Sequence, residues 1–258
     1  VRHSYSNKRW QAAYHLVSMF EGPNAVEVTP EITRALQDAF EESASDNEME
    51  VRQYLALAMG CTGEADFVIP LLEALSNDPV ENTPFLIRAL GRLGDDRAAE
   101  AIATYLEDTN VTIRLESAVA LGAMGNTTVK PALTKALNDS EPNVRWDAAI
   151  ALAKLGDTGG AATLLQLLDR AYLAGFEEVD EKETHRILQV VVQVAAGLHL
   201  NELDGAIKMV AAKDPNMAVR QAAQQALDYH KNNKAAQAAA KISIVLRSEK
   251  QAYVRQSA

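Results

Sequence analysis

The sequence holds a single cysteine, Cys61, among 258 residues, and only 5% of its residues are aromatic. One cysteine excludes a disulfide within the chain and any metal site built from several thiolates, and we expect a buried, unreactive thiol. No run of about 18 apolar residues occurs, so no membrane-spanning helix is predicted. No signal peptide opens the printed sequence, and a cytoplasmic location is the expectation.

Patterns typical of enzymes are also missing. A metal site needs histidines spaced to meet each other or a carboxylate, and the histidines here are scattered. They are His3, His15, His185, His199 and His230. The pair Gly159-Gly160 does not make a phosphate-binding loop, since it lacks the remaining residues of such a motif. We therefore predict no catalytic residue, no metal and no cofactor.

Excess positive charge is absent as well. The chain carries 35 acidic and 25 basic residues, for a net charge of −10. Binding to nucleic-acid phosphates needs clustered Lys and Arg, so nucleic-acid binding or repair is the least favoured function. The apolar residues that make up 48% of the chain are mostly Ala and Leu. This composition favours closely packed helices over sheets.

A unit repeats along the chain every 31 residues. It reads as an Asp, an Arg six residues later, an Ala/Leu stripe and a closing Gly. Its frames are Asp139, Arg145, Leu152 and Gly156; Asp108, Arg114, Leu121 and Gly125; Asn77, Thr83, Leu90 and Gly94; and Asp46, Arg52, Met59 and Gly63. Fixed spacing of this kind predicts a stack of helix pairs, each too small to bury its apolar face alone.

The predicted architecture is all-α: one solenoid of about seven helix pairs over residues 1–258. The repeats are placed at 6–43, 46–77, 78–107, 108–138, 139–171, 180–213 and 214–246. The spacing from Arg145 to Arg186 grows to 41 residues, which indicates an insertion at 170–183. The last repeat includes a helix over 235–246, and residues 247–258 are expected to form a frayed tail.

The repeat arginine lies on the inward face of its helix. Counting from this Arg, positions −1, +3, +4, +7 and +11 share one face at 100° per residue. A buried Arg needs an acidic partner, so we predict a ladder in which each Asp caps its helix and accepts from the Arg of its own or the adjacent repeat. Its members are Asp46, Arg52, Asp108, Arg114, Asp139, Arg145, Asp180, Arg186, Asp214 and Arg220. A row of arginines that bind anions is the alternative.

The pattern Asp-x5-Arg-x2-Ala-Ala-x-Ala-Leu-x3-Gly resembles HEAT repeats, and is most similar to the short bacterial type named from phycobilisome lyase subunits. The resemblance covers residues 6–230. It implies a right-handed α-α superhelix in which the second helix of each pair lines the concave side. HEAT-type deoxyhypusine hydroxylases carry iron-binding His-Glu pairs, and this sequence has no His-Glu dipeptide.

Two surfaces are candidates for binding another protein. When the second helices are aligned by the 31-residue period, the positions predicted to point away from the core form a partly apolar strip. The 170–183 insertion is acidic and has two aromatic residues. The candidate residues are Val68, Leu72, Lys130, Thr134, Lys135, Leu165, Tyr172 and Phe176. Ordinary repeat surface and a solvated linker are the respective alternatives. Trp10 and Trp146 share position +1, where packing against a neighbouring repeat is favoured over ligand stacking.

We therefore predict a scaffold without catalytic activity that binds a segment of another protein, of unidentified kind, along its concave groove or through the insertion. The resemblance implies a second possibility: a subunit of a bilin lyase or isomerase that binds a tetrapyrrole. The sequence itself does not favour this, because Cys61 lies on a first helix rather than in the predicted groove. The number of copies that associate is not indicated.

Overall fold

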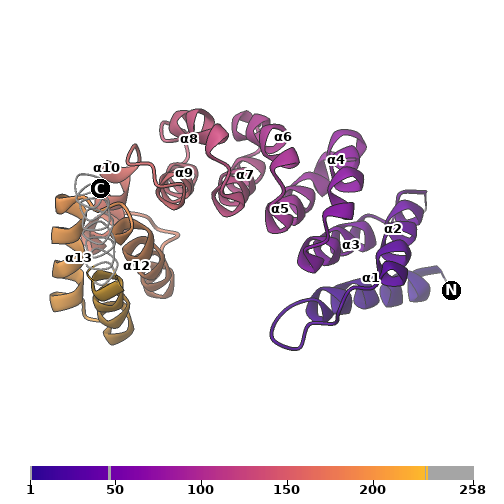
Figure 1. Cartoon of the computed structure of the whole chain (residues 1–258), viewed down its shortest axis with the longest axis horizontal. Helices are drawn as coiled ribbons and strands as arrows, with labels where there is room; N and C mark the ends of the chain where they lie inside the picture. Colours follow the sequence, from indigo (N-terminus) through magenta and orange to yellow (C-terminus); the bar gives the residue numbers. More distant parts are fainter. Residues whose placement is uncertain (1, 46–47, 230, 232–258) are drawn as a thin grey trace, which may run out of the picture. The chain divides into compact units, whose positions relative to one another are not determined.

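The computed structural model describes residues 2–45, 48–229 and 231 of the chain (Figure 1). No strand occurs among them, which confirms the all-α prediction. The chain divides into two compact units, Val1–Gly160 and Ala161–Ala258, called unit 1 and unit 2 below. The predicted helix at 235–246 and the predicted tail at 247–258 lie outside the described residues. One continuous solenoid over the whole chain stays a prediction.

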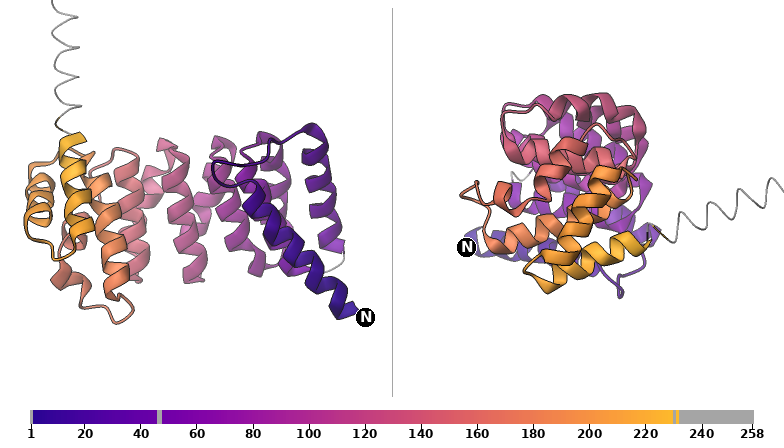
Figure 2. Two further views of the ribbon diagram at one scale, coloured as in Figure 1. Left: turned by 90° about the horizontal axis from the view of Figure 1, so that it is seen from below. Right: turned by 90° about the vertical axis from the view of Figure 1, so that its left-hand side faces the viewer.

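Unit 1 consists of two rows of helices. The inner row is α1 (Arg2–Met19), α3 (Met49–Thr62), α5 (Thr83–Leu93), α7 (Val111–Met124) and α9 (Pro142–Lys154), each packed on the next. The outer row is α2 (Pro30–Ser45), α4 (Val68–Asn77), α6 (Ala99–Thr104) and α8 (Lys130–Ala136), which pack on α3, α5, α7 and α9. Figure 2 shows the same helices from two further sides.

The arginine-bearing helices lie on the inside of the bend of unit 1, and α4, α6 and α8 lie on its outside (Figure 1). We expected the reverse, with the second helix of each pair on the concave side. The expectation was wrong: the first helices line the inside of the bend, and each second helix packs on the first helix of the following pair, α4 on α5, α6 on α7 and α8 on α9. The packed helix pairs of unit 1 therefore start one helix earlier than the pairs predicted from the 31-residue repeat.

The core of unit 1 lies between the two rows. Positions +3, +4 and +7 of the inner-row helices point into it, as predicted: Ala148, Ala149 and Leu152 of α9 are fully buried. Position +11 does not. The frame glycines there are exposed and adopt left-handed φ angles of 66–77°, so each ends its helix. They are Gly63, Gly94, Gly125 and Gly156.

Neighbouring inner-row helices approach each other very closely at position +8. A Cβ atom built on Gly60 would lie 2.6 Å from the Cα of Ala89, which is too near for any side chain. The contact repeats between Gly91 and Ala120, and between Gly122 and Ala151. In α9 the same position holds Ala153, and unit 1 ends shortly afterwards at Gly160. The glycine series thus coincides with the tightly stacked part of the chain.

Unit 2 contains α10 (Ala161–Leu167), α11 (Arg170–Leu173), α12 (Glu181–Ala196), α13 (Asn201–Lys213) and a helix at 217–229. Helix α10 packs on α11, α12 and α13. The predicted insertion begins with α11, whose N-terminus is capped by Asp169 and whose Leu173 is fully buried. The first part of the insertion is therefore folded into unit 2 rather than being a plain linker.

We expect Gly91→Ala to destabilise unit 1 by about 1–3 kcal/mol, because the new methyl group overlaps Ala120 and the backbone of α7 resists displacement. Gly205→Ala in α13 is the matched control, since no atom lies within 4 Å of its added Cβ and its φ is not positive. The control should be neutral or slightly stabilising, as alanine favours a helix. Denaturant unfolding followed by circular dichroism measures both, and equal effects would contradict the close-approach argument.

Candidate functional site: an aromatic pocket on the inner row

A pocket of about 270 Å³ opens on the inner row of unit 1, where three successive helices contribute aromatic side chains. Its lining residues are Trp10 of α1, Glu50, Gln53 and Tyr54 of α3, and Phe85 of α5. The rings of Trp10 and Tyr54 stack with centroids 6.1 Å apart and planes 28° from parallel. Tyr14 meets Tyr54 edge-on at 5.5 Å, and half of its surface is exposed.

The helical period places these rings on the open side of the row. Tyr54 and Phe85 both occupy position +2, which is about 160° around the helix from the repeat arginine at 100° per residue. Positions +3, +4 and +7 face the core, so position +2 faces away from the outer row. This pocket was not among the predicted binding surfaces, because the second helices were expected to line the concave side. The signal was the aromatic pair at one repeat position.

A polar network links one lining residue, Gln53, to the segment that precedes α5. The Gln53 amide donates to the carbonyl of Glu81 at 3.2 Å and to the side-chain oxygen of Asn82 at 3.1 Å. Asn82 is buried and donates to Asp78 at 3.0 Å. Because these bonds join α3 to the start of α5, the spacing between Tyr54 and Phe85 is held by more than apolar packing. The Glu50 carboxylate is exposed and has no hydrogen-bond partner in the described part of the chain.

Repeat arginines connect successive repeats on the core side of the same helices. Arg114 donates from Nε and Nη2 to the two carboxylate oxygens of Asp139, at 2.8 and 2.9 Å. Its Nη1 donates to the carbonyl of Asp108 at 2.9 Å. Both side chains of the ion pair are only 10–11% exposed. One guanidinium thus binds the backbone of its own repeat and the carboxylate of the next.

Arg52 makes the same kind of contacts. Arg52 binds both carboxylate oxygens of Asp78 and the carbonyl of Phe40. In the third frame, which has Asn77 and Thr83 at the Asp and Arg positions, the acidic partner is Asp78, one residue after Asn77. Asp46, the predicted partner of Arg52, lies outside the described residues.

Arg145 and Arg220 donate to backbone carbonyls of their own frame, at 2.8 Å to Asp139 and 2.6 Å to Asp214. Arg186 instead pairs with Glu183 of its own helix. Asp180 caps that helix by accepting from the Glu183 amide at 2.7 Å. Asp180 is thus an N-cap residue, as predicted. Asp108 and Asp139 are not, because the N-cap residues of α7 and α9 are Asn110 and Glu141. The ion pair of Arg114 with Asp139 joins neighbouring repeats.

An arginine that the frame did not include completes the pattern in unit 2. Arg170 donates from Nε and Nη2 to both carboxylate oxygens of Asp214, at 2.7 and 2.8 Å. The Asp214 side chain is 3% exposed, so its charge depends on this partner. Arg170 stands 44 residues before Asp214, against 25 between Arg114 and Asp139. The 170–183 insertion changes the spacing between repeats, so the fixed 31-residue period did not predict the pairing of Arg170 with Asp214.

Burial alone would raise the pKa of the Asp139 carboxyl. The hydrogen bonds from Arg114 and from the Glu141 amide, with the positive charge of Arg114, outweigh burial and hold this pKa below its ordinary value. The pKa of Asp214 is lowered in the same way, by Arg170 and the Asn216 amide acting against burial. Both carboxyls are therefore charged at neutral pH.

The predicted partner-binding residues are dispersed. Val68 is fully buried and cannot contact a partner; that prediction was wrong because Val68 shares the inward stripe of α4 with Leu71 and Leu75. Leu72 is half-buried against the core of unit 1. Lys130 and Lys135 pair with Asp157 and Glu107, and Thr134 donates to the carbonyl of Lys130. Leu165, Tyr172 and Phe176 belong to unit 2 and are half-buried, with the two rings in edge contact at 5.2 Å.

Cys61 is half-buried rather than fully buried. Burial raises the pKa of its thiol, although Arg92 lies close enough to donate to its sulfur at 2.6 Å. A raised pKa lowers the thiolate fraction and hence reactivity. Trp146 is 5% exposed, in accord with a packing role.

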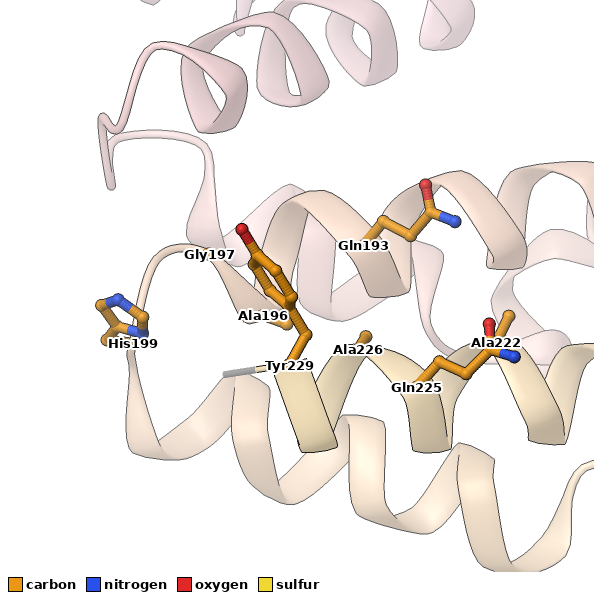
Figure 3. Close-up of a pocket in the computed structure, with 8 residues that line it drawn as sticks. All are labelled: Gln193, Ala196, Gly197, His199, Ala222, Gln225, Ala226 and Tyr229. Atoms are coloured by element: carbon orange, nitrogen blue, oxygen red, sulfur yellow. The ribbon is translucent and has the colours of Figure 1, made fainter. Parts of the chain in front are cut away.

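Unit 2 has a groove of its own, of about 440 Å³, between the end of α12 and the helix at 217–229 (Figure 3). Small residues form its floor and two glutamines and an aromatic ring stand at its edges. The lining residues are Gln193, Ala196, Gly197, His199, Ala222, Gln225, Ala226 and Tyr229. His199 adopts a left-handed φ of 59°. The groove offers close approach and amide hydrogen bonds, but no carboxylate or ammonium group.

We expect Asp139→Ala to cost about 3 kcal/mol of stability, because it leaves the Arg114 guanidinium buried without its carboxylate. Arg114→Met should cost less, since Met keeps the packing and the remaining carboxylate still accepts from the Glu141 amide. The double variant should be more stable than Asp139→Ala alone. Arg145→Met is the control and should change little, because Arg145 binds carbonyls and not the Asp139 carboxylate. Chemical unfolding of the four variants tests this order, and additive effects would contradict the pairing.

The lowered pKa of Asp139 predicts a loss of stability in acid. A carboxyl with a lower pKa in the folded state stabilises the protein above its unfolded pKa of about 3.9. That stabilisation is lost as the pH falls through the folded value. NMR titration of the Asp139 carboxyl should give a pKa below 3.9 in the wild type and a higher one in Arg114→Met. The variant should also show a flatter fall of unfolding free energy below about pH 4. An unchanged pKa in the variant would exclude Arg114 as the cause.

The model of the HEAT-repeat family matches the chain over residues 84–138 and 105–173. No curated protein matches it in sequence. A solved complex of CpcE and CpcF of phycocyanin lyase from Nostoc sp. PCC7120 shares the fold. The present chain is 20% identical to the matched chain of that complex, with a TM-score of 0.60. The match covers 86% of the present chain and 82% of the other. Human deoxyhypusine hydroxylase is 18% identical over 88% and 80% of the two chains, with a TM-score of 0.39.

No helix among the described residues is long and apolar enough to cross a membrane. The same residues contain no cluster of His, Cys, Asp or Glu that could hold a metal ion. Within unit 1 the matched residues include α5, α7 and α9, the stacked inner-row helices that end at Gly94, Gly125 and Gly156. The chain therefore contains HEAT repeats over residues 84–173.

Proposed function

We propose that this protein is a scaffold without catalytic activity, which holds a segment of another protein against the inner row of unit 1. The observation that supports this most directly is the pocket that Trp10, Tyr54 and Phe85 line from three successive helices. Aromatic residues are only 5% of the chain, so three aromatic residues lining one pocket stand out against the composition. Large aromatic side chains at exposed concave sites dominate the energy of many protein interfaces.

The surrounding structure favours a rigid binding surface. The Gly60 contact with Ala89 fixes α3 against α5, and the Gln53 bonds hold the same pair at the pocket itself. On the next pair of helices, Arg88 of α5 binds both carboxylate oxygens of Glu116 of α7. A surface that needs no ordering on binding loses less entropy when a partner segment docks. Val119 of the next inner-row helix, α7, is also exposed.

The similar solved structure is a complex of two chains, and this supports a protein partner for the present chain as well. It also motivates a second candidate function, a subunit that binds a tetrapyrrole, since that complex is a phycocyanin lyase. Identity of 20% carries only the fold. The 170–183 insertion stays a possible additional contact, because Tyr172 and Phe176 keep part of their surface exposed.

Affinity capture from the source cells, followed by mass spectrometry, tests the proposal. We expect Phe85→Ser to lower recovery of a co-purifying protein by about tenfold or more, the usual effect of removing an interface aromatic. Ile69→Ser on the outer-row helix α4 is the matched control, since Ile69 is 47% exposed and should leave recovery unchanged. Circular dichroism confirms that both variants fold.

Other outcomes contradict the proposal. If Phe85→Ser retains the partner and the double variant Leu72→Glu plus Leu165→Glu loses it, the partner binds the second helices instead. Loss in Ala222→Glu alone would assign it to the groove of unit 2. A visible absorption band in the eluate, or on mixing the protein with a bilin, would favour the tetrapyrrole-binding function.

A further inference from the structure

We propose that the aromatic pocket binds a cation, namely the ammonium or guanidinium group of a lysine, methylated lysine or arginine side chain of the partner. This inference rests on the proposed function and names the chemistry that the partner must present. It is carried by the combination of ring faces, one carboxylate and a small volume at a single site. The rings are those of Trp10, Tyr54 and Phe85, and the carboxylate is that of Glu50.

Aromatic rings attract cations because the face of each ring carries partial negative charge. A pocket lined by several rings multiplies this attraction, and proteins recognise alkylammonium groups in this way. Trp10, the strongest of the three ring types for such contacts, stacks on Tyr54 with centroids 6.1 Å apart. The chain already uses the interaction within unit 1, where the Arg52 guanidinium lies 3.9 Å from the centroid of the Phe40 ring.

The charges around the pocket favour a cation over an anion. Glu50 is the one lining residue with a carboxyl, amino or guanidinium group, and its carboxylate has no partner in the described part of the chain. Glu81, which follows on the loop before α5, is exposed. Two arginines of the same row form ion pairs: Arg9 with Glu48 and Arg88 with Glu116. A positive group entering the pocket therefore meets uncompensated negative charge.

The size of the pocket limits what can enter. A volume of about 270 Å³ is below the usual range of roughly 300–1,000 Å³ for sites that enclose a whole drug-sized ligand. It suits the end of one side chain, while the rest of the partner segment lies along the row. A purely apolar side chain would fill the same space but would leave Glu50 without a counter-charge. The rings and the carboxylate together thus favour a cationic anchor residue.

Choline and its uncharged isostere 3,3-dimethylbutan-1-ol test the inference without any partner, because they share shape and differ in charge. Saturation-transfer NMR titration of the wild type should show choline bound about five- to twentyfold more tightly, as expected for cation–π attraction at a partly open site. Raising the salt from 50 to 500 mM should narrow this preference, since part of it comes from the exposed Glu50.

Two variants separate the contribution of the aromatic rings from that of the Glu50 carboxylate. Phe85→Leu keeps an apolar side chain but removes a ring, so it should lower the preference for choline more than the affinity for the alcohol. Glu50→Gln should weaken choline about two- to fivefold and leave the alcohol unchanged. Their controls are Tyr229→Leu in the unit 2 groove and Glu100→Gln on α6, which should both bind choline as the wild type does.

Equal binding of the two probes would overturn the cation site and leave an apolar pocket. Binding of neither probe at tens of millimolar would overturn it as well. Neither result touches the capture experiment, which measures recovery of a whole partner protein. Conversely, loss of the partner in Phe85→Ser together with equal probe binding would support the scaffold and reject the cationic anchor.

Discussion

The distance between neighbouring inner-row helices is the constraint on which unit 1 depends. It is set where Gly60 meets Ala89, Gly91 meets Ala120 and Gly122 meets Ala151, because a Cβ at any of these glycines would lie 2.6–2.7 Å from the facing alanine. Helices this close bury their small residues completely and leave larger side chains room only on the two sides of the row. One side becomes the core, with Leu90 and Leu121 fully buried. The other side carries the aromatic pocket, so the spacing that stabilises the stack also determines how far apart Tyr54 and Phe85 lie.

Close helices alone would not fix the order or register of the repeats, since an Ala/Leu face is nearly uniform along its length. The repeat arginines fix both the order and the register. Arg114 can satisfy its donors only if Asp108 lies in its own turn and Asp139 in the following one. A shift by one residue would bury an unpaired charge, which is far more costly than a lost apolar contact. Arg52 with Asp78, and Arg170 with Asp214 in unit 2, impose the same condition. Stability at these sites therefore comes with specificity for one arrangement.

The residues that make the fold and those that make the pocket are different sets. Positions +3, +4, +7 and +8 serve packing, and this is the part that HEAT repeats of any function share. Position +2 holds Tyr54 and Phe85 in two helices but Glu116 and Asp147 in the next two, so it is free to vary without harming the stack. This explains why fold similarity at 20% identity to a phycocyanin lyase complex cannot transfer a function. Binding properties of this chain must be sought in side chains that the fold does not require.

The sequence by itself determined the all-α repeat, its 31-residue period, the buried Ala and Leu positions and the need for acidic partners near the arginines, because each follows from local helical periodicity and the cost of burying charge. Tertiary structure decided which row forms the inside of the bend, which carboxylate each arginine reaches, and that Val68 is core rather than surface. It also brought Trp10 together with Tyr54 and Phe85, which are 44 and 75 positions away along the chain. Those outcomes depend on which helix packs on which, and a periodic sequence offers two nearly equivalent pairings. Only the close contacts between specific faces distinguish them.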